Sequence, residues 1–559
     1  MVATRRTVRS RAFVSAIVGG VVLGSLLAAS APALAEDDPF PLAVTHERLS
    51  PLDPVFAGGD GTVGAVGVRK VPNPVCATVY VAGPEANTDC EGIAPRNETT
   101  IAVNPTNALN IIGGANDYQL SVSRGGTVYE TIYSRAHVTF DGGHTWTTFG
   151  LNNQNAYTAT GDPAIAFDAD GTAYYATLGF GWSQNIGCCR NPDIVVQTSG
   201  DSGRTWSAIN RIASGSGVFT GTGTFNDKEY VAAWGHGNAI VTWTVFNQGP
   251  RGSYVNSPIY ASVTHDGGKS WSAGHAISGS AGFCVGSGGS NNCDMDQFST
   301  PAVAADGSVY VSFVNFSNDS DGRDQYLVVK VNPTTGARIG GPHRVGTLYD
   351  GYTDYPLSIE GRQTLQDSQF RTNPAGNLAA DPTNAAHLAV IWSDPRNGLA
   401  TDDDPYATTT NSDVIISQSF DGGATWSPPA AITRTRDQFQ PWGGYDASGR
   451  LRVGFFDRSY DAANHQYGYT LATESAPGTL TFGFAQLTTQ LSDPTQGTRW
   501  FSGGTPNNAY PHPTSFLGDY SGIAISPTYG AVALWTDLRL NVTFGSRSGT
   551  SEDAFFGHP

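Results

Sequence analysis

The stretch TFDGGHTW at residues 139–146 is one of four copies of a single pattern in this chain. The other copies are SGDSGRTW at 199–206, THDGGKSW at 264–271 and SFDGGATW at 419–426. Each copy has Ser or Thr first, Asp third, Gly fifth, Thr or Ser seventh and Trp last. An Asp side chain accepts backbone N–H bonds across a tight turn, and glycine supplies the positive φ that such turns need. These stretches, which we call the repeated turns, predict hairpins between short strands.

The aspartates of the repeated turns could bind a metal or act in catalysis. A residue that recurs at the same turn of successive modules is, however, expected to hold each module together. We therefore predict that these aspartates are structural and that the tryptophans anchor the following strands in the core. The aspartates are Asp141, Asp201, Asp266 and Asp421, and the tryptophans are Trp146, Trp206, Trp271 and Trp426.

A second pattern, two short apolar strands around a tight turn, alternates with the repeated turns. Clear copies are DPAIAFDADGTAYYATLGF at 162–180 and TPAVAADGSVYVSFVNF at 300–316. Related copies begin at Glu98, Asp227, Asn377, Gln440 and Asp519. These copies, each combined with a second strand pair, predict an all-β protein, a β-propeller of seven four-stranded blades.

The last module ends at residues 553–556 without room for a fourth strand. A propeller ring must close to protect its sheet edges, so we expect an N-terminal strand within residues 62–82 to complete it. If the N-terminal segment formed a separate cap, the ring would have six blades. The expected domains are an export signal at 1–35, an N-terminal segment at 36–95 that partly closes the propeller, and the propeller at 96–559.

The N-terminus is typical of a bacterial export signal. Four arginines precede an apolar run over about residues 12–29, and the small-residue site Ala33-Leu34-Ala35 follows. The general secretion route and the twin-arginine route both stay open. We expect a secreted, extracellular monomer that does not insert into a membrane. The formal net charge of −17 opposes binding to nucleic acid or to anionic membranes.

Six cysteines in an exported chain favour disulfides. Local spacing pairs Cys76 with Cys90 and Cys284 with Cys293. The neighbours Cys188 and Cys189 then remain, either as a vicinal disulfide or as free or intermolecular thiols, because six cysteines allow 15 connectivities.

Strand alternation sorts the polar residues between two faces. The starts of the first strands and the ends of the second strands must share the face opposite the repeated turns. Near the starts of the first strands, closest to the axis, the chain places Glu98, Asp162, Asp227, Glu229, Gln440 and Asp519. Converging carboxylates would have raised pKa values or bind a cation, whereas the alternative is a water-filled hole lined with solvated acids. The candidate catalytic residues are Asp162, Asp227, Glu229 and Asp519.

The ends of three second strands repeat an aspartate followed by an arginine. The pairs are Asp394 with Arg396, Asp457 with Arg458, and Asp537 with Arg539. Arginine presents a planar fork that suits carboxylates, so these three pairs could bind an acidic sugar as a clamp. Alternatively, each arginine bonds its neighbouring aspartate and only fixes a loop.

One loop suggests a metal site. Asp319, Asp321 and Asp324 gather oxygen ligands around a glycine turn, which suits a structural Ca²⁺, although the full EF-hand pattern is missing. A solvated acidic loop is the alternative. No zinc, phosphate-loop or dinucleotide motif is found in the sequence, so we expect no required cofactor.

The four repeated turns resemble the Asp-box repeat of the sialidase-like propellers, and the resemblance covers about residues 97–557. That superfamily includes secreted glycoside hydrolases and non-catalytic proteins. Sialidases carry an Arg-Ile-Pro motif near the first blade that supplies one of three clamping arginines, whereas this chain has Arg96-Asn97-Glu98-Thr99-Thr100 there.

The resemblance implies a secreted propeller that acts on carbohydrate. The reaction implied is that of an exo-glycosidase on acidic sugars, with a protonated carboxyl and a second carboxylate or a tyrosine nucleophile. The alternative is a non-catalytic propeller that binds glycan or protein at the cell surface. In both cases the expected partner is a glycan or polysaccharide, or in the second case a protein.

Overall fold

The fold is taken from a computed structural model, in which the chain separates into two compact units, Met1–Leu34 and Ala35–Pro559. All described residues lie in the second unit. They are residues 69–70, 85–88, 95–122, 128–151, 156–183, 187–216, 222–250, 253–358, 362–398, 409–496, 516–544 and 547–559.

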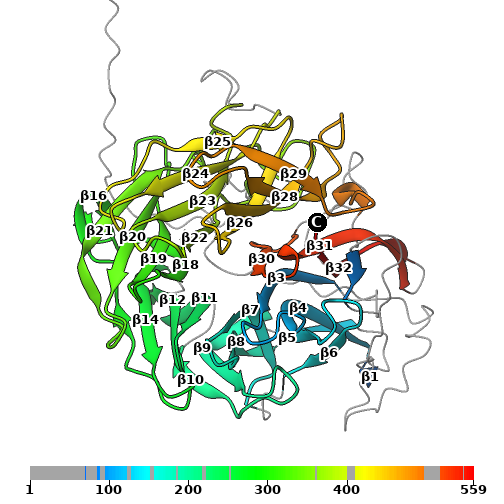
Figure 1. Ribbon diagram of the computed structural model, residues 1–559, viewed down its shortest axis with the longest axis horizontal. Helices are drawn as coiled ribbons and strands as arrows, with labels where there is room; N and C mark the ends of the chain where they lie inside the picture. Colours follow the sequence, from blue (N-terminus) through cyan, green and yellow to red (C-terminus); the bar gives the residue numbers. More distant parts are fainter. Residues whose placement is uncertain are drawn as a thin grey trace, which may run out of the picture. The chain divides into compact units, whose positions relative to one another are not determined.

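Seven four-stranded antiparallel sheets form the blades of a β-propeller (Figure 1). Blade 1 holds β3 (Arg96–Val103), β4 (Ile111–Val122), β5 (Val128–Thr139) and β6 (Thr147–Gly150). Blade 2 holds β7 (Ala159–Phe167), β8 (Ala173–Ser183), β9 (Gly187–Ser199) and β10 (Asn210–Ala213). Blade 3 holds β11 (Gly223–Trp234), β12 (Asn238–Gln248), β14 (Ile259–Thr264) and β15 (His275–Ala276).

The ring continues with the same order of strands in each sheet. Blade 4 holds β18 (Asp296–Val303), β19 (Val309–Asn315), β20 (Gln325–Val331) and β21 (Arg338–Thr347). Blade 5 holds β22 (Asn377–Ala380), β23 (Leu388–Asp394), β24 (Asp413–Ser419) and β25 (Ala430–Ile432). Blade 6 holds β26 (Gln438–Tyr445), β27 (Leu451–Asp457), β28 (Gly468–Glu474) and β29 (Phe482–Gln486).

Blade 7 combines both ends of the propeller: β30 (Gly522–Ser526), β31 (Gly530–Phe544), β32 (Arg547–Gly557) and the N-terminal β2 (Glu85–Asn87). Strand β2 pairs antiparallel with β32, with Glu85 opposite Gly557. The prediction of seven blades closed by an N-terminal strand is confirmed, and the six-blade alternative is wrong. The closing strand lies just beyond the expected range of 62–82, because the side chain of Glu85 also binds Arg539 on β31 and fixes the strand there.

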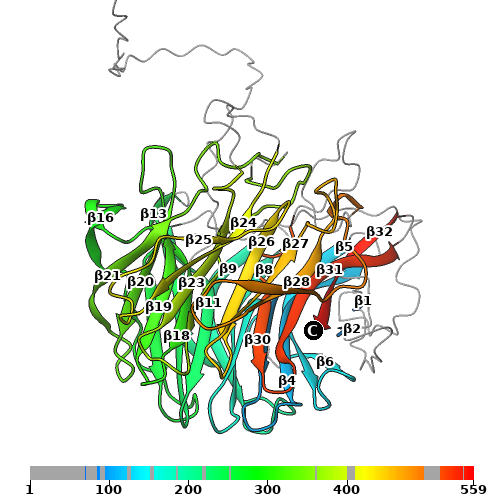
Figure 2. The ribbon, with the colours of Figure 1, turned by 45° about the horizontal axis from the view of Figure 1, so that its top comes forward.

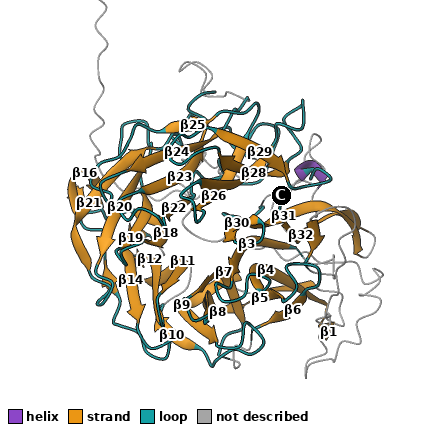
Figure 3. Ribbon diagram, in the orientation of Figure 1, coloured by secondary structure: helices purple, strands orange, loops and turns teal. Residues whose placement is uncertain are grey.

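A few shorter elements accompany the blades (Figure 3). Strand β1 (Arg69–Lys70) pairs with β4, and β13 (Tyr254–Asn256) pairs with β12. A separate hairpin consists of β16 (Ser280–Gly286) and β17 (Gly289–Asn292), and η2 (Pro494–Gln496) is a short 3-10 helix. In the described parts of the chain, no helix is long and apolar enough to span a membrane.

The apolar core lies between neighbouring blades. The side chains of β19 and β23 are buried on both faces of their sheets, because each sheet is covered by a blade on either side. Tyr310 and Val314 of blade 4, for example, join one apolar cluster with Leu388, Val390 and Trp392 of blade 5. Strands buried on both faces read as continuous apolar runs, as seen in LAVIW of β23.

The four repeated turns share one set of hydrogen bonds. In the turn of blade 5, the Ser419 hydroxyl donates to Asp421 (2.8 Å), and Asp421 accepts the N–H (2.9 Å) and the hydroxyl (2.6 Å) of Thr425. The corresponding bonds recur in the turns at 139–146, 199–206 and 264–271. The structural role predicted for these aspartates therefore agrees with the bonds that they accept.

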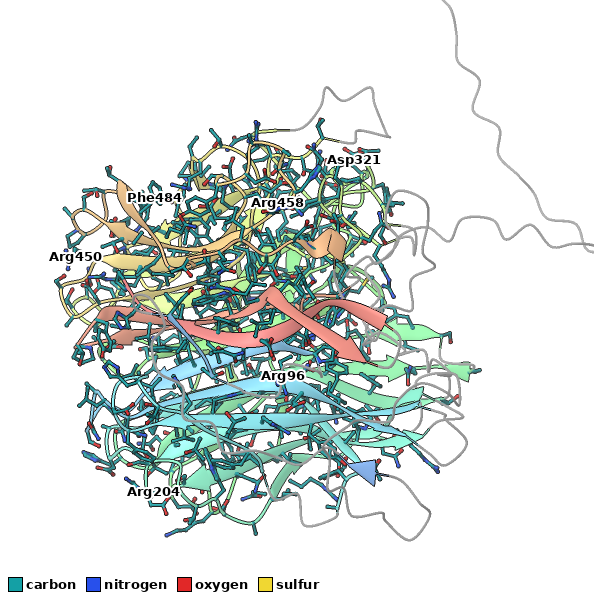
Figure 4. The ribbon with its side chains drawn as sticks, turned by 90° about the vertical axis from the view of Figure 1, so that its right-hand side faces the viewer. Arg96, Arg204, Asp321, Arg450, Arg458 and Phe484 are labelled. Atoms are coloured by element: carbon teal, nitrogen blue, oxygen red, sulfur yellow. A yellow bond between two sulfur atoms is a disulfide. The ribbon has the colours of Figure 1, made fainter. Side chains whose placement is uncertain are left out.

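The register places the repeated turns on one face and the starts of the first strands of the blades on the opposite face. In blade 5, Ser419 of the turn lies opposite Leu388 at the start of β23, whereas Asp394 ends β23 opposite Asp413. In blade 1, Arg96 at the start of β3 lies opposite Asp117 near the end of its neighbour β4. Figures 2 and 4 show the strands running from one face to the other, with Arg204 of a repeated turn on the side away from Asp321. We call the face on which the first strand of each blade starts the site face.

The tryptophans of the repeated turns all pack in or against the apolar core, as predicted, but they differ in burial. Trp146 is 1% exposed and contacts Phe556, with 5.1 Å between the ring centroids. Trp206, Trp271 and Trp426 are only partly buried.

We expect Trp146→Ala to lower the free energy of unfolding by about 3–5 kcal/mol, as for other buried aromatic residues. Trp206→Ala should cost less than half of that, because part of its ring is already in solvent. Urea denaturation of both variants measures the difference. An equal loss of unfolding free energy in the two variants would contradict the conclusion that Trp146 is more deeply buried than Trp206.

The disulfide between Cys284 and Cys293 is confirmed, with an S–S distance of 2.07 Å. Cys284 lies within β16 and Cys293 directly follows β17, so the disulfide links the two sides of this hairpin. Cys76, Cys90 and the side chains of Cys188 and Cys189 lie outside the described residues, and their pairing stays a prediction.

Candidate functional site

The first strands of five blades carry the same β-bulge at the site face. In each, two residues lie opposite one residue of the second strand, and the first bulge residue has a positive φ although it is not glycine. These residues are Glu98, Asp162, Lys228, Phe298 and Gln440. Such a conformation is strained for a residue with a side chain, and bulges commonly redirect side chains beside functional sites. Figure 1 shows these first strands nearest the axis of the ring.

The bulge residues Glu98 and Asp162, together with Asp519, meet at the ammonium group of a third bulge residue, Lys228. The Lys228 Nζ lies 2.9 Å from Glu98 Oε1, 2.8 Å from Asp162 Oδ2 and 2.7 Å from Asp519 Oδ2. Blades 1, 2 and 3 and the segment before β30 thus each supply one of these four side chains. With the adjacent groups they form what we call the axial cluster. Its members are Glu98, Asp162, Asp227, Lys228, Glu229, Arg371 and Asp519.

Asp519 is held from a second side. Arg371 donates through Nε (2.9 Å) and Nη2 (2.6 Å) to the two oxygens of Asp519, and Asn373 adds a bond of 3.2 Å. Gly518, which precedes Asp519, has a φ of +90°, and a Cβ there would lie 2.6 Å from the backbone nitrogen of Glu98. Glycine therefore lets the chain approach Glu98 closely enough for Asp519 to reach Lys228.

The pKa of Asp519 falls below its usual range. Burial by itself would raise it, but the charges of Arg371 and Lys228 and their hydrogen bonds outweigh burial. Asp519 is consequently an ionised carboxylate across the physiological pH range. The pKa of Lys228 is raised, since the surrounding carboxylates outweigh its burial, and the lysine stays charged.

Other carboxyl groups of the cluster shift in the opposite direction. Burial raises the pKa of Asp227 to about 7. Burial also raises the pKa of Glu98 and of Glu229 well above the usual range, and the charge of Asp162 adds to both shifts. The axial cluster thus combines an ionised carboxylate with carboxyl groups that hold protons near neutral pH.

Glu229 stands out at the second position of its bulge. In two other blades this position carries a hydroxyl that donates to the preceding blade: Thr99 to the Leu534 carbonyl (2.6 Å) and Ser299 to Thr242 (3.0 Å). Glu229 is 3% exposed, yet neither of its carboxyl oxygens has a hydrogen-bond partner among the described residues. A buried polar group without a partner is costly, and one explanation is a functional role.

An axial pocket adjoins the cluster. Its lining includes Lys228, Glu229 and Asp519 together with Tyr230, Trp442 and Tyr520. The ring of Trp442 lies 4.8 Å from that of Tyr230 and 6.3 Å from that of Tyr520, measured between centroids. Charged groups and aromatic rings therefore share one concave site, as is usual for small-molecule sites.

The structure brings together the four residues predicted as catalytic, Asp162, Asp227, Glu229 and Asp519, around Lys228. The alternative of solvated acids in a water-filled hole is wrong, because these side chains are buried and three of the cluster's acids share one ammonium group. Gln440, also expected near the axis, donates instead to the Gly518 carbonyl.

The predicted clamp arginines are bonded locally. Arg396 donates to both oxygens of Asp394 (2.8 and 2.6 Å), and Arg539 does the same to Asp537 (2.8 and 2.7 Å). These two pairs match the alternative in which each arginine fixes a loop.

The third pair differs from the expectation. Arg458, which Figure 4 labels, is fully buried and lies 3.4 Å from Asp437, while Asp457 pairs with Arg434 at 2.8 Å. The Arg458 Nη1 also donates to the backbone carbonyls of Gln366 and Asn464. Pairing between adjacent residues is therefore wrong here, because the chain turns Arg458 toward the loop before blade 5.

The predicted calcium ligands do not converge. Asp319 accepts the N–H groups of Asp321 (2.9 Å) and Arg323 (3.0 Å), and Asp324 accepts the N–H of Ser317 (2.6 Å). Among the described residues, no group of three or more His, Cys, Asp or Glu side chains is placed to hold a metal ion. Two of these carboxylates bond the backbone of their own loop, and a Ca²⁺ bound there stays a prediction.

Sequence reasoning missed Lys228, Arg371 and the aromatic lining of the pocket. Lys228 lies between Asp227 and Glu229, at the repeat position of Glu98 and Asp162, so an alignment of the repeats could have found it. Arg371 comes from an irregular segment before blade 5, and no repeat marks its position.

We expect the free energy of unfolding to fall between about pH 5 and pH 8 by a few kcal/mol. Carboxyl groups whose pKa is raised by folding stabilise the fold fully below their unfolded values, and this contribution is lost as the pH rises through their folded values. For Asp227 the folded pKa is about 7. Denaturation at several pH values measures the slope, and Asp227→Asn should reduce it. A stability that rises over this range would contradict the assignment.

Comparison with known proteins gives no match to any family model or curated protein. Among solved structures, the chain is similar to a Hadza microbial sialidase, with 15% identity and a TM-score of 0.36 over 65% of this chain and 63% of that protein. It is similar to the NanB sialidase from Streptococcus pneumoniae, with 9% identity and a TM-score of 0.39 over 83% and 93%. It is also similar to an alpha-L-arabinanase from Penicillium chrysogenum, with 12% identity and a TM-score of 0.39 over 86% and 98%. The chain spans less than two thirds of the Hadza sialidase, and these likenesses concern the fold alone.

Proposed function

We propose that the chain is a glycoside hydrolase whose active site is the axial cluster. The observation that carries this proposal is the opposite shift of carboxyl pKa values within one buried site. Asp519 is held ionised by Arg371 and Lys228, whereas burial keeps Glu229 protonated. Enzymes that cleave glycosidic bonds use such a pair, one carboxylic acid and one carboxylate.

In this proposal Glu229 gives its proton to the leaving oxygen while the glycosidic bond breaks, and Asp519 attacks the sugar carbon to form an ester. Water then hydrolyses the ester, and Glu229 takes back a proton. Direct attack suits a compact site, and Glu229 and Asp519 line the same pocket. Tyr520 is less suited as nucleophile, because burial raises its pKa well above the usual value and keeps it protonated.

A second candidate is a non-catalytic propeller that binds glycan or protein. The observation in its favour is that Lys228 binds three buried carboxylates at once, an arrangement that also fixes the blades around the axis. In that case the pocket would bind a sugar without cleaving it.

A panel of chromogenic glycosides, in both anomers and including pyranosides and furanosides, tests the proposal. We expect turnover of at least one member, with loss of turnover in Glu229→Gln. Turnover unchanged by this substitution would remove Glu229 from the mechanism. Binding on a glycan array without any turnover would favour the second candidate.

We also propose that the protein acts outside the cell, supported by the export signal in its sequence. The matured protein should appear in the culture medium with an N-terminus near Glu36. Retention of the uncleaved chain inside the cell would contradict this.

A further inference from the structure

We infer that the axial pocket takes an uncharged, hydroxyl-bearing sugar ring and excludes a carboxylated one. This inference rests on the proposed function, because it names the substrate class of the same site. It departs from the acidic sugars that the resemblance implies. Three features of the site support it: the cations near the pocket, the acids that remain without partners, and the aromatic rings between them.

The cation in the pocket wall is already saturated. An ammonium group has three N–H donors, and the Lys228 Nζ has three carboxylate oxygens at 2.7–2.9 Å. A ligand carboxylate could bind Lys228 only by displacing Glu98, Asp162 or Asp519. Displacement would leave a buried acid without its counterion, which is unfavourable.

The arginines of the site face are similarly occupied. Arg371 directs Nε and Nη2 to Asp519, so its charge is matched by a carboxylate that the pocket itself contains. Arg396 and Arg539 each bond both oxygens of a neighbouring aspartate. Arg371, Arg396 and Arg539 therefore form no bidentate clamp for an acidic sugar.

The charge of the cluster further disfavours an anion. The two cations of the cluster, Lys228 and Arg371, are both already paired with Asp519. Asp519, which lines the pocket, is ionised. A ligand carboxylate in the pocket would lie close to this negative charge in a site of low dielectric, where like charges repel strongly.

The groups that lack partners suit hydroxyls instead. Glu229 lines the pocket with both carboxyl oxygens unpaired, and Asp227 Oδ1 is also buried without a partner among the described residues. A protonated carboxyl can donate to one hydroxyl and accept from another. The rings of Tyr230, Trp442 and Tyr520 offer apolar surface for the ring of the sugar. A ligand that offers hydroxyls to the carboxyl groups and an uncharged ring to the aromatic side chains is a neutral sugar.

Matched glycosides that differ only at C6 test the inference. The probes are p-nitrophenyl glucosides against glucuronides and galactosides against galacturonides, in both anomers, with an array of neutral and sialylated glycans for binding. We expect the full-length protein to bind or turn over an uncharged member at least about 100-fold better than its carboxylated partner. Trp442→Ala should weaken that binding about tenfold or more, while Lys330→Met, on a third strand away from the pocket, serves as the control.

The outcomes separate this inference from the proposed function. Preference for a carboxylated or sialylated member overturns the inference but leaves hydrolysis in place. Binding of uncharged glycans without turnover supports the substrate class and overturns hydrolysis. Turnover or binding that is equal within each matched pair overturns the inference, as does an array on which neither class is bound.

Discussion

Replacing Lys228 by methionine is expected to lower the free energy of unfolding at pH 7 by about 3–5 kcal/mol, the usual effect of removing one partner from a buried ionic group. The substitution keeps the length of the side chain but removes the ammonium that Glu98, Asp162 and Asp519 share. The carboxylates would then repel one another in a buried site. Chemical denaturation monitored by circular dichroism measures the loss.

The pH dependence of this loss identifies its cause. In the variant no ammonium charge lowers the pKa of Glu98 and of Asp519, so these two acids bind protons more readily at low pH and the destabilisation should be smaller near pH 4 than at pH 7. Lys330→Met is the matched control, since the Lys330 Nζ lies 5.3 Å from the Tyr310 ring centre and bridges no buried acid among the described residues. Equal stability of Lys228→Met and the unmodified protein at pH 7 would contradict the role of the ammonium group.

Asp519→Asn is expected to lower kcat about 10²–10⁴-fold on any glycoside that the protein cleaves. The amide keeps the shape of the side chain and can still accept a bond from Arg371, but it cannot attack the sugar as a carboxylate does. Turnover at saturating substrate, with thermal denaturation to confirm folding, measures the effect.

Asp421→Asn provides the comparison on the other face. Asp421 is exposed in a repeated turn and bonds Thr425, far along the blade from the axial cluster. Its substitution should cost some stability while leaving kcat unchanged. If Asp519→Asn retained full turnover, Asp519 would be a structural counterion of Lys228 and Arg371 and not a nucleophile.

Much of the fold could be predicted from the sequence, because it depends on local and repeated signals. The spacing of Thr139, Asp141 and Trp146 recurs in four turns, and strand alternation alone places those turns opposite Asp394 and Asp537. The position of β2 was less accessible, since its pairing depends on residues more than four hundred positions away. The burial of Trp206 depends on the neighbouring blade and was overestimated.

The site was predicted only in part, for a different reason. Acids at the strand starts could be identified, and the structure brings them together. The basic partners of these acids could not be identified. Arg371 lies in an irregular segment that no repeat marks, and Lys228 stands between two acids in the sequence. The bulge at Lys228 requires a positive φ. A glycine at that position would have indicated such a φ, but a lysine does not. The clamp was misjudged because sequence shows which arginines are near an aspartate, not which carboxylate each one bonds.

Closure of the ring by β2 has a consequence for the order of folding. During synthesis β2 emerges before any blade is complete, but its partner β32 is made more than four hundred residues later, with Glu85 opposite Gly557. Blades 1 to 6 can assemble in sequence, whereas blade 7 needs both ends at once, and until then its β-sheet edge stays open. Loss of a few residues around Gly557 would leave β2 unpaired and turn a closed ring into an open stack, prone to pair with other chains.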